Sequence, residues 1–240
     1  MRNALAPTLW LALLAGLTFA MPLLEPLLAW IEPDRQSVLY QRESLAALLL
    51  NHSMLVVGAT LVAALVGIGA GIAVTRPGGR DFLPLASRLA SIGQTFPPVA
   101  VLALAVPMIG FGNGPTLLAL MLYGLLPILR NTLAGLDGVA PAVKEAGTGM
   151  GLSRPALLLQ VELPLSKRVI LAGIRTSMTI NMATAAIGST VGTQTLGDPV
   201  IAGLVNGNTA YVLQGALLIA VLALFTDSLF EAIERRWAIA

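Results

Sequence analysis

Long apolar stretches run through this chain and decide what it can fold into. A membrane-spanning helix needs about 20 mostly apolar residues, and stretches near that length lie at about 8–29, 54–74, 83–109, 116–136, 169–187 and 212–233. Only 11% of the residues are charged, whereas soluble domains have about 25% charged residues. The sequence therefore predicts an all-α, polytopic membrane protein with about six transmembrane helices.

The first apolar stretch, at 8–29, has two interpretations. A secretory signal has a short apolar core followed by a cleavage site of small residues. This stretch is longer, and Leu17-Thr18-Phe19-Ala20 is a poor cleavage site, which favours a retained helix. We expect residues 1–44 to hold this helix and an outer segment, added to a five-helix core over 45–240.

The basic residues predict the orientation, because short loops rich in Lys and Arg remain in the cytoplasm. Of the 14 basic residues, only Arg35 and Arg42 lie on one side of the predicted helices. The other 12 lie at or near the opposite side: Arg2, Arg76, Arg80, Arg88, Arg130, Lys144, Arg154, Lys167, Arg168, Arg175, Arg235 and Arg236. The N- and C-termini and the loop at 137–168 are then cytoplasmic. Residues 30–53, 110–115 and 188–211 face outward.

Residue types that catalysis or metal binding would need are scarce. The chain has no cysteine and a single histidine, His52, which excludes thiolate catalysis, Cys-ligated metals and a histidine cluster within the chain. The predicted helices have almost no Asp or Glu away from their ends, although a proton-driven carrier usually keeps a buried acid. Gly67, Gly69 and Gly71 lie inside an apolar helix, so they are not a phosphate loop; Gly67 and Gly71 predict a helix-packing face.

Two interruptions of helix regularity are candidates for a translocation path. Gln94 and Thr95 precede Pro97 and Pro98, and adjacent prolines remove two backbone donors and unwind a turn. Carbonyls freed at membrane depth are tolerated only where protein or water satisfies them. These four residues either line a path or form a structural kink.

The second interruption is a polar stripe at Ser177, Thr179, Asn181 and Thr184. An asparagine in the middle of a membrane is costly unless it is hydrogen-bonded. Ser177, Asn181 and Thr184 are therefore candidate path residues, or they join neighbouring helices.

The polar loop at 137–168 bears most directly on function. The spacing predicts a short helix over 139–150, with one side formed by Val139, Val143, Ala146 and Met150. Gly147, Gly149 and Gly151 permit a sharp turn and the close approach of another backbone. Held parallel to the membrane, this helix would present Glu145 to a soluble partner.

This loop resembles the EAA motif of permease subunits in binding-protein-dependent ABC importers. Glu145, Ala146, Gly151, Leu163 and Pro164 match that motif at its spacing. Gly147 replaces the third alanine and Val161 replaces an isoleucine. The resemblance implies an ABC type I importer permease fold with a cytoplasmic coupling helix, and it assigns Glu145, Ala146, Gly147, Gly151, Leu163 and Pro164 to contact with an ATPase.

Further stretches resemble the osmoprotectant branch of these permeases, which imports glycine betaine, choline, carnitine and related solutes. The stretches are 94–98, 106–112, 125–132, 169–176 and 192–198, and the similarity extends over about 45–238. Quaternary ammonium groups suit aromatic cages. Because aromatic residues make up only 5% of this chain, we expect the cage in a binding protein and a weakly binding, largely neutral path here.

The resemblance also implies the partners. The chain would form half of a translocator, paired with itself or with a paralogous permease, in the bacterial inner (cytoplasmic) membrane. Separate ABC ATPase subunits would hold ATP–Mg, so the chain would be a transport subunit without enzymatic activity, cofactor or metal. A periplasmic or lipid-anchored substrate-binding protein would deliver the solute, membrane lipid would surround the helices, and no nucleic acid is expected.

Three alternatives remain open at this point. An ABC importer permease for amino acids or methionine would share the loop but not the solute. An ion-driven carrier would be expected to show an internal repeat or a buried acid. An intramembrane enzyme would need a nucleophile–base pair or metal ligands, and the sequence supplies no convincing set.

Overall fold

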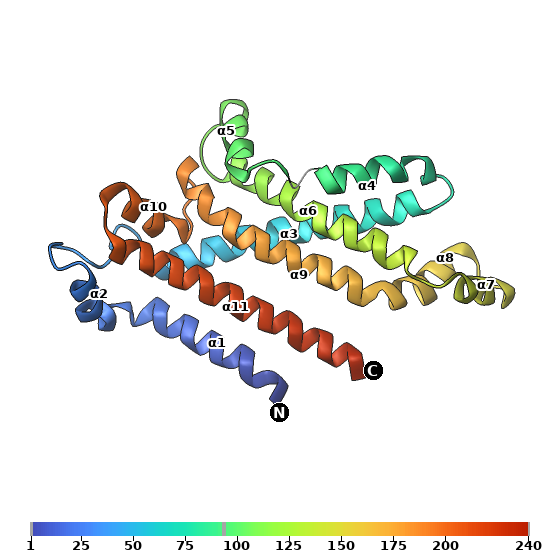
Figure 1. Ribbon diagram of the computed structural model, residues 1–240, viewed down its shortest axis with the longest axis horizontal. Helices are drawn as coiled ribbons and strands as arrows, with labels where there is room; N and C mark the ends of the chain where they lie inside the picture. The colour runs from blue at the N-terminus through green and yellow to red at the C-terminus, as the bar shows by residue number, and fades with distance from the viewer. Residues whose placement is uncertain (1, 93–94, 240) are drawn as a thin grey trace. The chain divides into compact units, whose positions relative to one another are not determined.

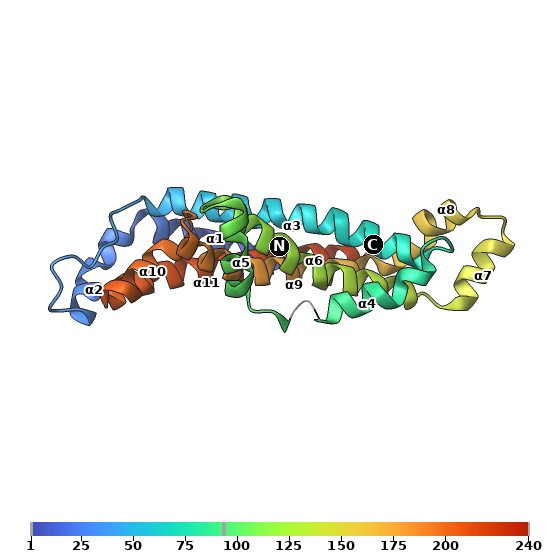
Figure 2. The same cartoon turned by 90° about the horizontal axis from the view of Figure 1, so that it is seen from above.

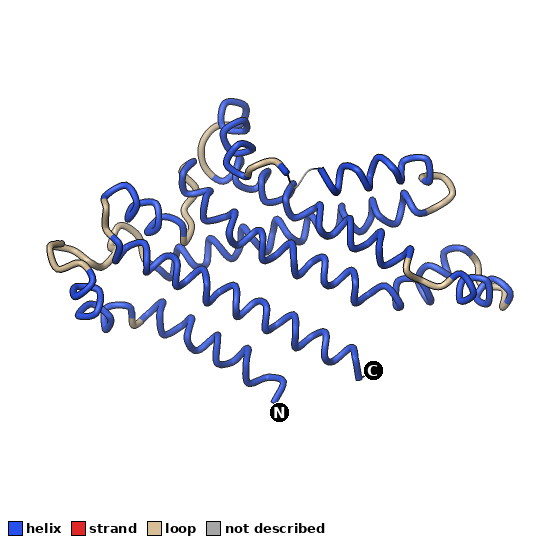
Figure 3. Tube along the Cα trace, in the orientation of Figure 1, coloured by secondary structure: helices blue, strands red, loops and turns tan. Residues whose placement is uncertain are grey.

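The computed structural model describes residues 2–92 and 95–239, and these are almost entirely helical, with no strand among them (Figure 3). In chain order (Figure 1) they form α1 (Arg2–Phe19), η1 (Met21–Leu24), α2 (Glu25–Ile31), α3 (Leu45–Thr75), η2 (Arg80–Phe82), α4 (Leu83–Ile92), α5 (Pro98–Ile109), α6 (Asn113–Asp137), α7 (Pro141–Gly149), α8 (Arg154–Leu157), the π-helical turn η4 (Leu158–Glu162), α9 (Leu163–Ile187), η5 (Gly188–Val191), α10 (Gly197–Asn206) and α11 (Thr209–Ile239). The predicted all-α fold class is confirmed.

Several helices have the length and composition to cross a membrane. Among the described residues these are α3, α6 and Thr209–Trp237 of α11, with a fourth if the bent pair Leu5–Phe19 and Met21–Ile31 forms one span. α9 is not among them, because Arg175 and the polar stripe lower its hydropathy. The chain is thus a multi-pass membrane protein, and the number six remains a prediction.

The expected spans differ from straight helices in two places. The stretch at 8–29 bends by 79° between Leu5–Phe19 and Met21–Ile31. Pro22 and Pro26, near the starts of η1 and α2, cannot donate the backbone bonds that would continue α1. The stretch at 83–109 is divided between α4 and α5, so the predicted interruption before Pro98 is confirmed.

The contacts divide the chain into two compact units. The first consists of Met1–Gly58, Pro98–Leu120 and Thr179–Ala240, and the second of Ala59–Pro97 and Met121–Met178. In the first unit α1 and α10 both pack on α11, and α1 runs beside α11 in Figure 1. The N-terminal helix is therefore a packed part of this unit.

The second unit confirms the predicted packing face of α3. A Cβ atom at Gly67 would lie 3.1 Å from Cγ2 of Ile128, and one at Gly71 would lie 2.7 Å from Cγ2 of Thr132. A Cβ atom at Gly69, between them, would meet nothing within 4 Å. Gly67 and Gly71 thus let α3 approach α6 closely, which is the usual role of small residues in membrane helix packing.

Replacing Gly71 with alanine should destabilise the protein. The new methyl group overlaps buried Thr132, which is held by a 2.8 Å hydrogen bond from its Oγ1 to the Ile128 carbonyl. Overpacking of this kind costs about 1–3 kcal/mol, and thermal unfolding of the detergent-purified protein should show it. Gly69→Ala is the matched control, and its melting temperature should be unchanged or slightly raised. Equal losses in the two variants would contradict the assignment.

Candidate functional site

The loop between α6 and α9 contains the short helix that the sequence predicts. α7 begins at Pro141, where a missing backbone N–H costs nothing, and ends at Gly149. α7 and α8 contact each other and lie side by side at one end of the second unit in Figures 1 and 2. The predicted helix at 139–150 is confirmed, with slightly later start and earlier end.

α7 presents a mixed polar and apolar surface. Glu145 and Ala146 are exposed. Val143 is 40% exposed, and Met150, directly after the helix, is 76% exposed. Exposed apolar side chains beside a carboxylate on a short loop helix suit contact with another protein.

The two motif glycines of this loop have different roles. Gly151 has a φ of +84° and follows α7, so it forms the left-handed turn that the sequence predicts. Gly147 is buried, and a Cβ atom there would lie 2.6 Å from Cδ1 of Leu157. Gly147 is therefore a packing position rather than a turn, and its side of α7 lies against the α8–η4 segment.

A buried carboxylate links α7 to the end of α3. Glu162 is only 4% exposed, and its Oε2 lies 2.6 Å from Nη1 of Arg76. This contact is a charge pair without an aligned hydrogen bond. Oε1 of Glu162 lies 3.8 Å from Nζ of Lys144. A buried carboxylate is tolerated only when opposite charges accompany it, so Glu162 requires both cations.

The same lysine ties α7 to the end of α6. Nζ of Lys144 donates a 3.0 Å hydrogen bond to the carbonyl of Leu136, in the last turn of α6. A cation there also favours the negative end of the helix dipole. Together these groups border a cavity of about 390 Å³ lined by Thr75, Arg76, Arg80, Leu83, Ser87, Leu133, Leu136, Asp137, Lys144 and Glu162. Sequence reasoning did not identify Arg76, Lys144 or Glu162 as a group.

Leu163 and Pro164 are the first two residues of α9. Residues 154–187 are helical throughout, and the π-helical turn at Leu158–Glu162 precedes Pro164. Proline lacks the N–H that would bond the carbonyl four residues earlier, and a π turn shifts the bonding pattern at this point. Leu163 is partly buried and Pro164 is exposed.

The structure places the candidate path residues in two different environments. Gln94 lies outside the described residues. Thr95 and Pro97 are exposed, and Pro98 is partly buried at the start of α5. The hydroxyl of Tyr123 donates to the carbonyl of Phe96, so protein satisfies a backbone carbonyl beside this interruption.

Three residues of the polar stripe on α9 are buried, whereas the fourth, Thr179, is exposed. Ser177 and Asn181 are 0% exposed and Thr184 is 4% exposed. The hydroxyl of Thr184 donates a 2.9 Å hydrogen bond to the Ile180 carbonyl. The described candidates of the two groups differ in exposure, and their role in a path stays a prediction.

Comparisons with known proteins establish the class of this chain. Residues 63–239 match the family described as binding-protein-dependent transport system inner membrane component. The chain belongs to this family. It is accordingly a permease component of a transport system, and not an enzyme.

Three curated relatives have similar lengths. The osmoprotectant import permease protein OsmY of Salmonella typhimurium is 37% identical over 95% of this chain and 97% of its own length. The choline transport system permease protein OpuBD of Bacillus subtilis is 38% identical over 77% of this chain and 81% of its own. The carnitine transport permease protein OpuCD of Listeria monocytogenes is 36% identical over 77% of this chain and 82% of its own length.

Solved structures share the fold. A chain of the inward-facing MetNI methionine ABC transporter superposes with a TM-score of 0.71, 18% identity, and coverage of 82% of this chain and 99% of that one. A chain of an amino acid ABC transporter with histidines gives a TM-score of 0.67, 19% identity, and coverage of 80% and 92%. The fold is that of an ABC importer permease, as the sequence predicts.

Replacing Glu162 with glutamine should loosen the loop. The amide keeps the shape but leaves Arg76 and Lys144, each about 30% exposed, without their counter-charge. Because these cations are partly exposed, solvent screens them. We therefore expect the free energy of unfolding to fall by about 1–3 kcal/mol, measured by thermal or denaturant unfolding. Glu145→Gln, which removes an exposed carboxylate from the same loop, should change stability by less than about 0.5 kcal/mol. Indistinguishable unfolding curves for the two variants would refute the role of Glu162.

Proposed function

We propose that this chain is one of two permease subunits of an ATP-driven importer for osmoprotectants such as glycine betaine, choline or carnitine. The observation that carries the proposal is α7, an exposed helix bearing Glu145 and tied to the ends of α3 and α6. The names of the three curated relatives support the solute class. The partner permease is a second copy or a paralogue, and membrane lipid surrounds the pair.

In this proposal α7 is the coupling helix. An ABC ATPase subunit, which holds ATP–Mg, contacts Glu145, Ala146 and the neighbouring apolar side chains. When the ATPase dimer closes, α7 moves, and the Glu162 ion pairs pass that movement to the ends of α3 and α6. The helices then alternate between inward and outward access. Gly151 provides the turn that lets α7 leave the following segment, and Gly147 keeps α7 close to Leu157.

The orientation that this mechanism needs is the one favoured by the basic residues. We place both termini and α7 in the cytoplasm of a bacterial inner membrane, and the segments at 30–53 and 188–211 outside. A periplasmic or lipid-anchored substrate-binding protein docks on that outer side. We further propose that residues 1–44 are an addition to a transport domain at 45–240, which is in keeping with a family match that begins at residue 63.

Glu145→Ala should abolish most ATP-dependent uptake while leaving the protein folded. Glu145 is exposed, so its loss removes a contact with the ATPase and not a packing interaction. The measurement is uptake of radiolabelled glycine betaine into proteoliposomes holding all transporter subunits, with and without internal ATP. We expect a reduction of about tenfold or more, equivalent to the loss of one or two charge-assisted hydrogen bonds.

Glu25→Ala, which removes an exposed carboxylate from the first turn of α2, is the control and should transport normally. Normal uptake by Glu145→Ala would refute the coupling role. A panel of choline, carnitine, methionine and histidine identifies the solute class, and uptake of only the amino acids would overturn the osmoprotectant assignment.

Gly151→Val should also reduce transport. A β-branched residue is strained at a φ of +84°, so the turn after α7 must change and the helix is displaced. Gly149→Val provides the comparison, because Gly149 lacks a positive φ and a Cβ atom there meets nothing within 4 Å. Pull-down of the ATPase by each variant, together with uptake, measures the effect. Equal ATPase binding and uptake in the two variants would exclude a requirement for this turn.

A further inference from the structure

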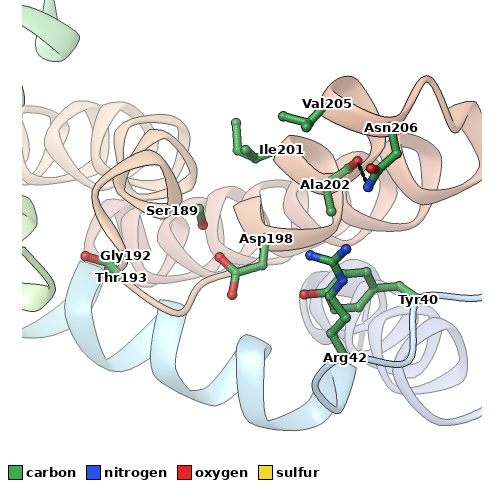
Figure 4. A pocket seen from close by; sticks show the side chains of 10 residues that line it. All are labelled: Tyr40, Arg42, Ser189, Gly192, Thr193, Asp198, Ile201, Ala202, Val205 and Asn206. Atoms are coloured by element: carbon green, nitrogen blue, oxygen red, sulfur yellow. Dashed lines mark hydrogen bonds between the residues drawn. The ribbon is translucent and has the colours of Figure 1, made fainter.

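The first unit contains a second cavity that the coupling mechanism does not use. It has a volume of about 370 Å³ and lies between the segment preceding α3 and the helix α10. Figure 4 shows its lining: Tyr40, Arg42, Ser189, Gly192, Thr193, Asp198, Ile201, Ala202, Val205 and Asn206. In the proposed orientation this pocket opens on the outer side. Its volume falls within the range of about 300–1,000 Å³ that small-ligand pockets occupy.

One side of the pocket carries a negative charge. Asp198 lies in the first turn of α10 and is partly buried. Burial raises the pKa of this carboxyl above its usual value, the Ser189 hydroxyl and the Thr195 backbone oppose that rise, and the charge of Glu43 adds to it. Within the described residues no basic side chain forms an ion pair with Asp198. The carboxylate therefore lies in the pocket without an ion-pair partner among the described residues.

The other side of the pocket carries a positive charge. Arg42 is exposed and, in the described part of the chain, has no hydrogen bond or ion pair. Figure 4 shows its guanidinium and the Asp198 carboxylate as separate groups in one pocket. Guanidinium and carboxylate groups normally pair when they can reach each other, so their separation leaves room for a ligand carrying both charges.

The pocket lining also includes an aromatic ring in a fixed position. Tyr40 is buried, and its ring meets that of Tyr211 edge to face at 5.6 Å. Burial, followed by the charge of Asp198, raises the pKa of the Tyr40 phenol, so the hydroxyl stays neutral. The Tyr40 amide donates a 3.1 Å hydrogen bond to Oε1 of buried Gln214. A neutral ring beside a carboxylate is a favourable environment for an ammonium ion without N–H groups.

Further hydrogen bonds hold the segment at 32–40 against the α10–α11 turn. Arg35 donates to the carbonyls of Asn206 and Gly207 at 2.9 and 2.6 Å, and Nδ2 of Asn208 donates to the Ser37 carbonyl at 3.0 Å. Glu32 accepts a 2.7 Å hydrogen bond from the backbone N–H of Thr209, and hydrogen bonds to Thr209 lower the pKa of that carboxyl. The pocket is thus built before any ligand arrives, which reduces the entropy cost of binding.

We propose that this pocket binds a small zwitterion consisting of a quaternary ammonium and a carboxylate, with Arg42 holding the carboxylate and Asp198 and Tyr40 holding the ammonium. The proposal rests on the osmoprotectant function above and extends it, because it gives the permease its own receiving site on the outer side. The alternative occupant is a charged side chain of the docked binding protein. Such a side chain carries one charge, whereas this pocket offers both signs within the volume of a small solute. That pairing favours a zwitterion.

The test uses the permease–ATPase complex in nanodiscs without the binding protein. Saturable binding of radiolabelled glycine betaine is compared with that of choline, which has the ammonium but no carboxylate. Arg42→Gln should weaken glycine betaine binding by about tenfold or more and change choline binding less than about twofold. Asp198→Asn should weaken both by a similar factor.

Two further variants keep the result interpretable. Ile201→Trp fills the pocket without changing a charge and should abolish binding of both solutes. Asp34→Asn, which removes an exposed carboxylate from the same outer segment, should bind both normally. Size-exclusion profiles and melting temperatures establish that each variant is folded. Asp198→Asn should melt no lower than the parent near neutral pH, because burial disfavours the charged form that it removes.

Three outcomes would overturn the proposal: no saturable binding by the parent complex, unchanged binding by all pocket variants, or variants that weaken docking of the binding protein while binding both solutes normally. Uptake by the complete transporter separates this failure from failure of the proposed function. If the transporter takes up glycine betaine with ATP but the complex does not bind it, only the proposed pocket is refuted. If no osmoprotectant is taken up, both the proposed function and the proposed pocket are refuted.

Discussion

The ion pairs of Glu162 are the interaction on which the loop between α6 and α9 depends. A carboxylate buried beneath a short loop is unfavourable unless cations reach it, and here Arg76 comes from the end of α3 and Lys144 from α7. Lys144 also bonds the last turn of α6. Glu162 and its two cations therefore connect three separate parts of the second unit: the end of α3, α7 and the end of α6. Glu145, next to Lys144 in the chain, is exposed, so the lysine that anchors α7 adjoins an exposed carboxylate.

The second constraint is that backbone N–H and C=O groups need hydrogen-bond partners, and it explains how the structure accommodates the helix interruptions. The chain has many prolines, and each lacks a backbone donor. At membrane depth, the carbonyl left without that donor must be satisfied by protein or by water. The structure compensates locally. Tyr123 bonds the carbonyl of Phe96 beside the Pro97–Pro98 pair, and a π turn precedes Pro164. In the segment at 37–40, side chains satisfy the backbone instead, because Gln214 and Asn208 bond the irregular backbone at Ser37, Val38 and Tyr40.

The sequence predicted the fold class, α7, the close approach at Gly67 and Gly71, and the interruption before Pro98, because each depends on local spacing or on one residue type. It did not predict the 79° bend after Phe19, which follows from how prolines are placed in an otherwise uniform apolar run. The groups around Glu162 and Asp198 were missed for another reason. Arg76 and Glu162, or Arg42 and Asp198, are far apart in sequence, and no local pattern marks two residues that enter one ion pair or one pocket only after folding.

The π turn at Leu158–Glu162 has a consequence for the rest of α9. A π turn holds one residue more than an α turn, and each residue of an α-helix advances the facing direction by about 100°. The side of the helix that packs near Gly147 is therefore out of phase with the side that carries Ser177, Asn181 and Thr184. Without the extra residue, either the loop would lose its packing or the polar stripe would rotate out of the interior. The direction in which α9 presents these polar side chains is thus set, relative to the loop, by one extra residue just before the helix begins.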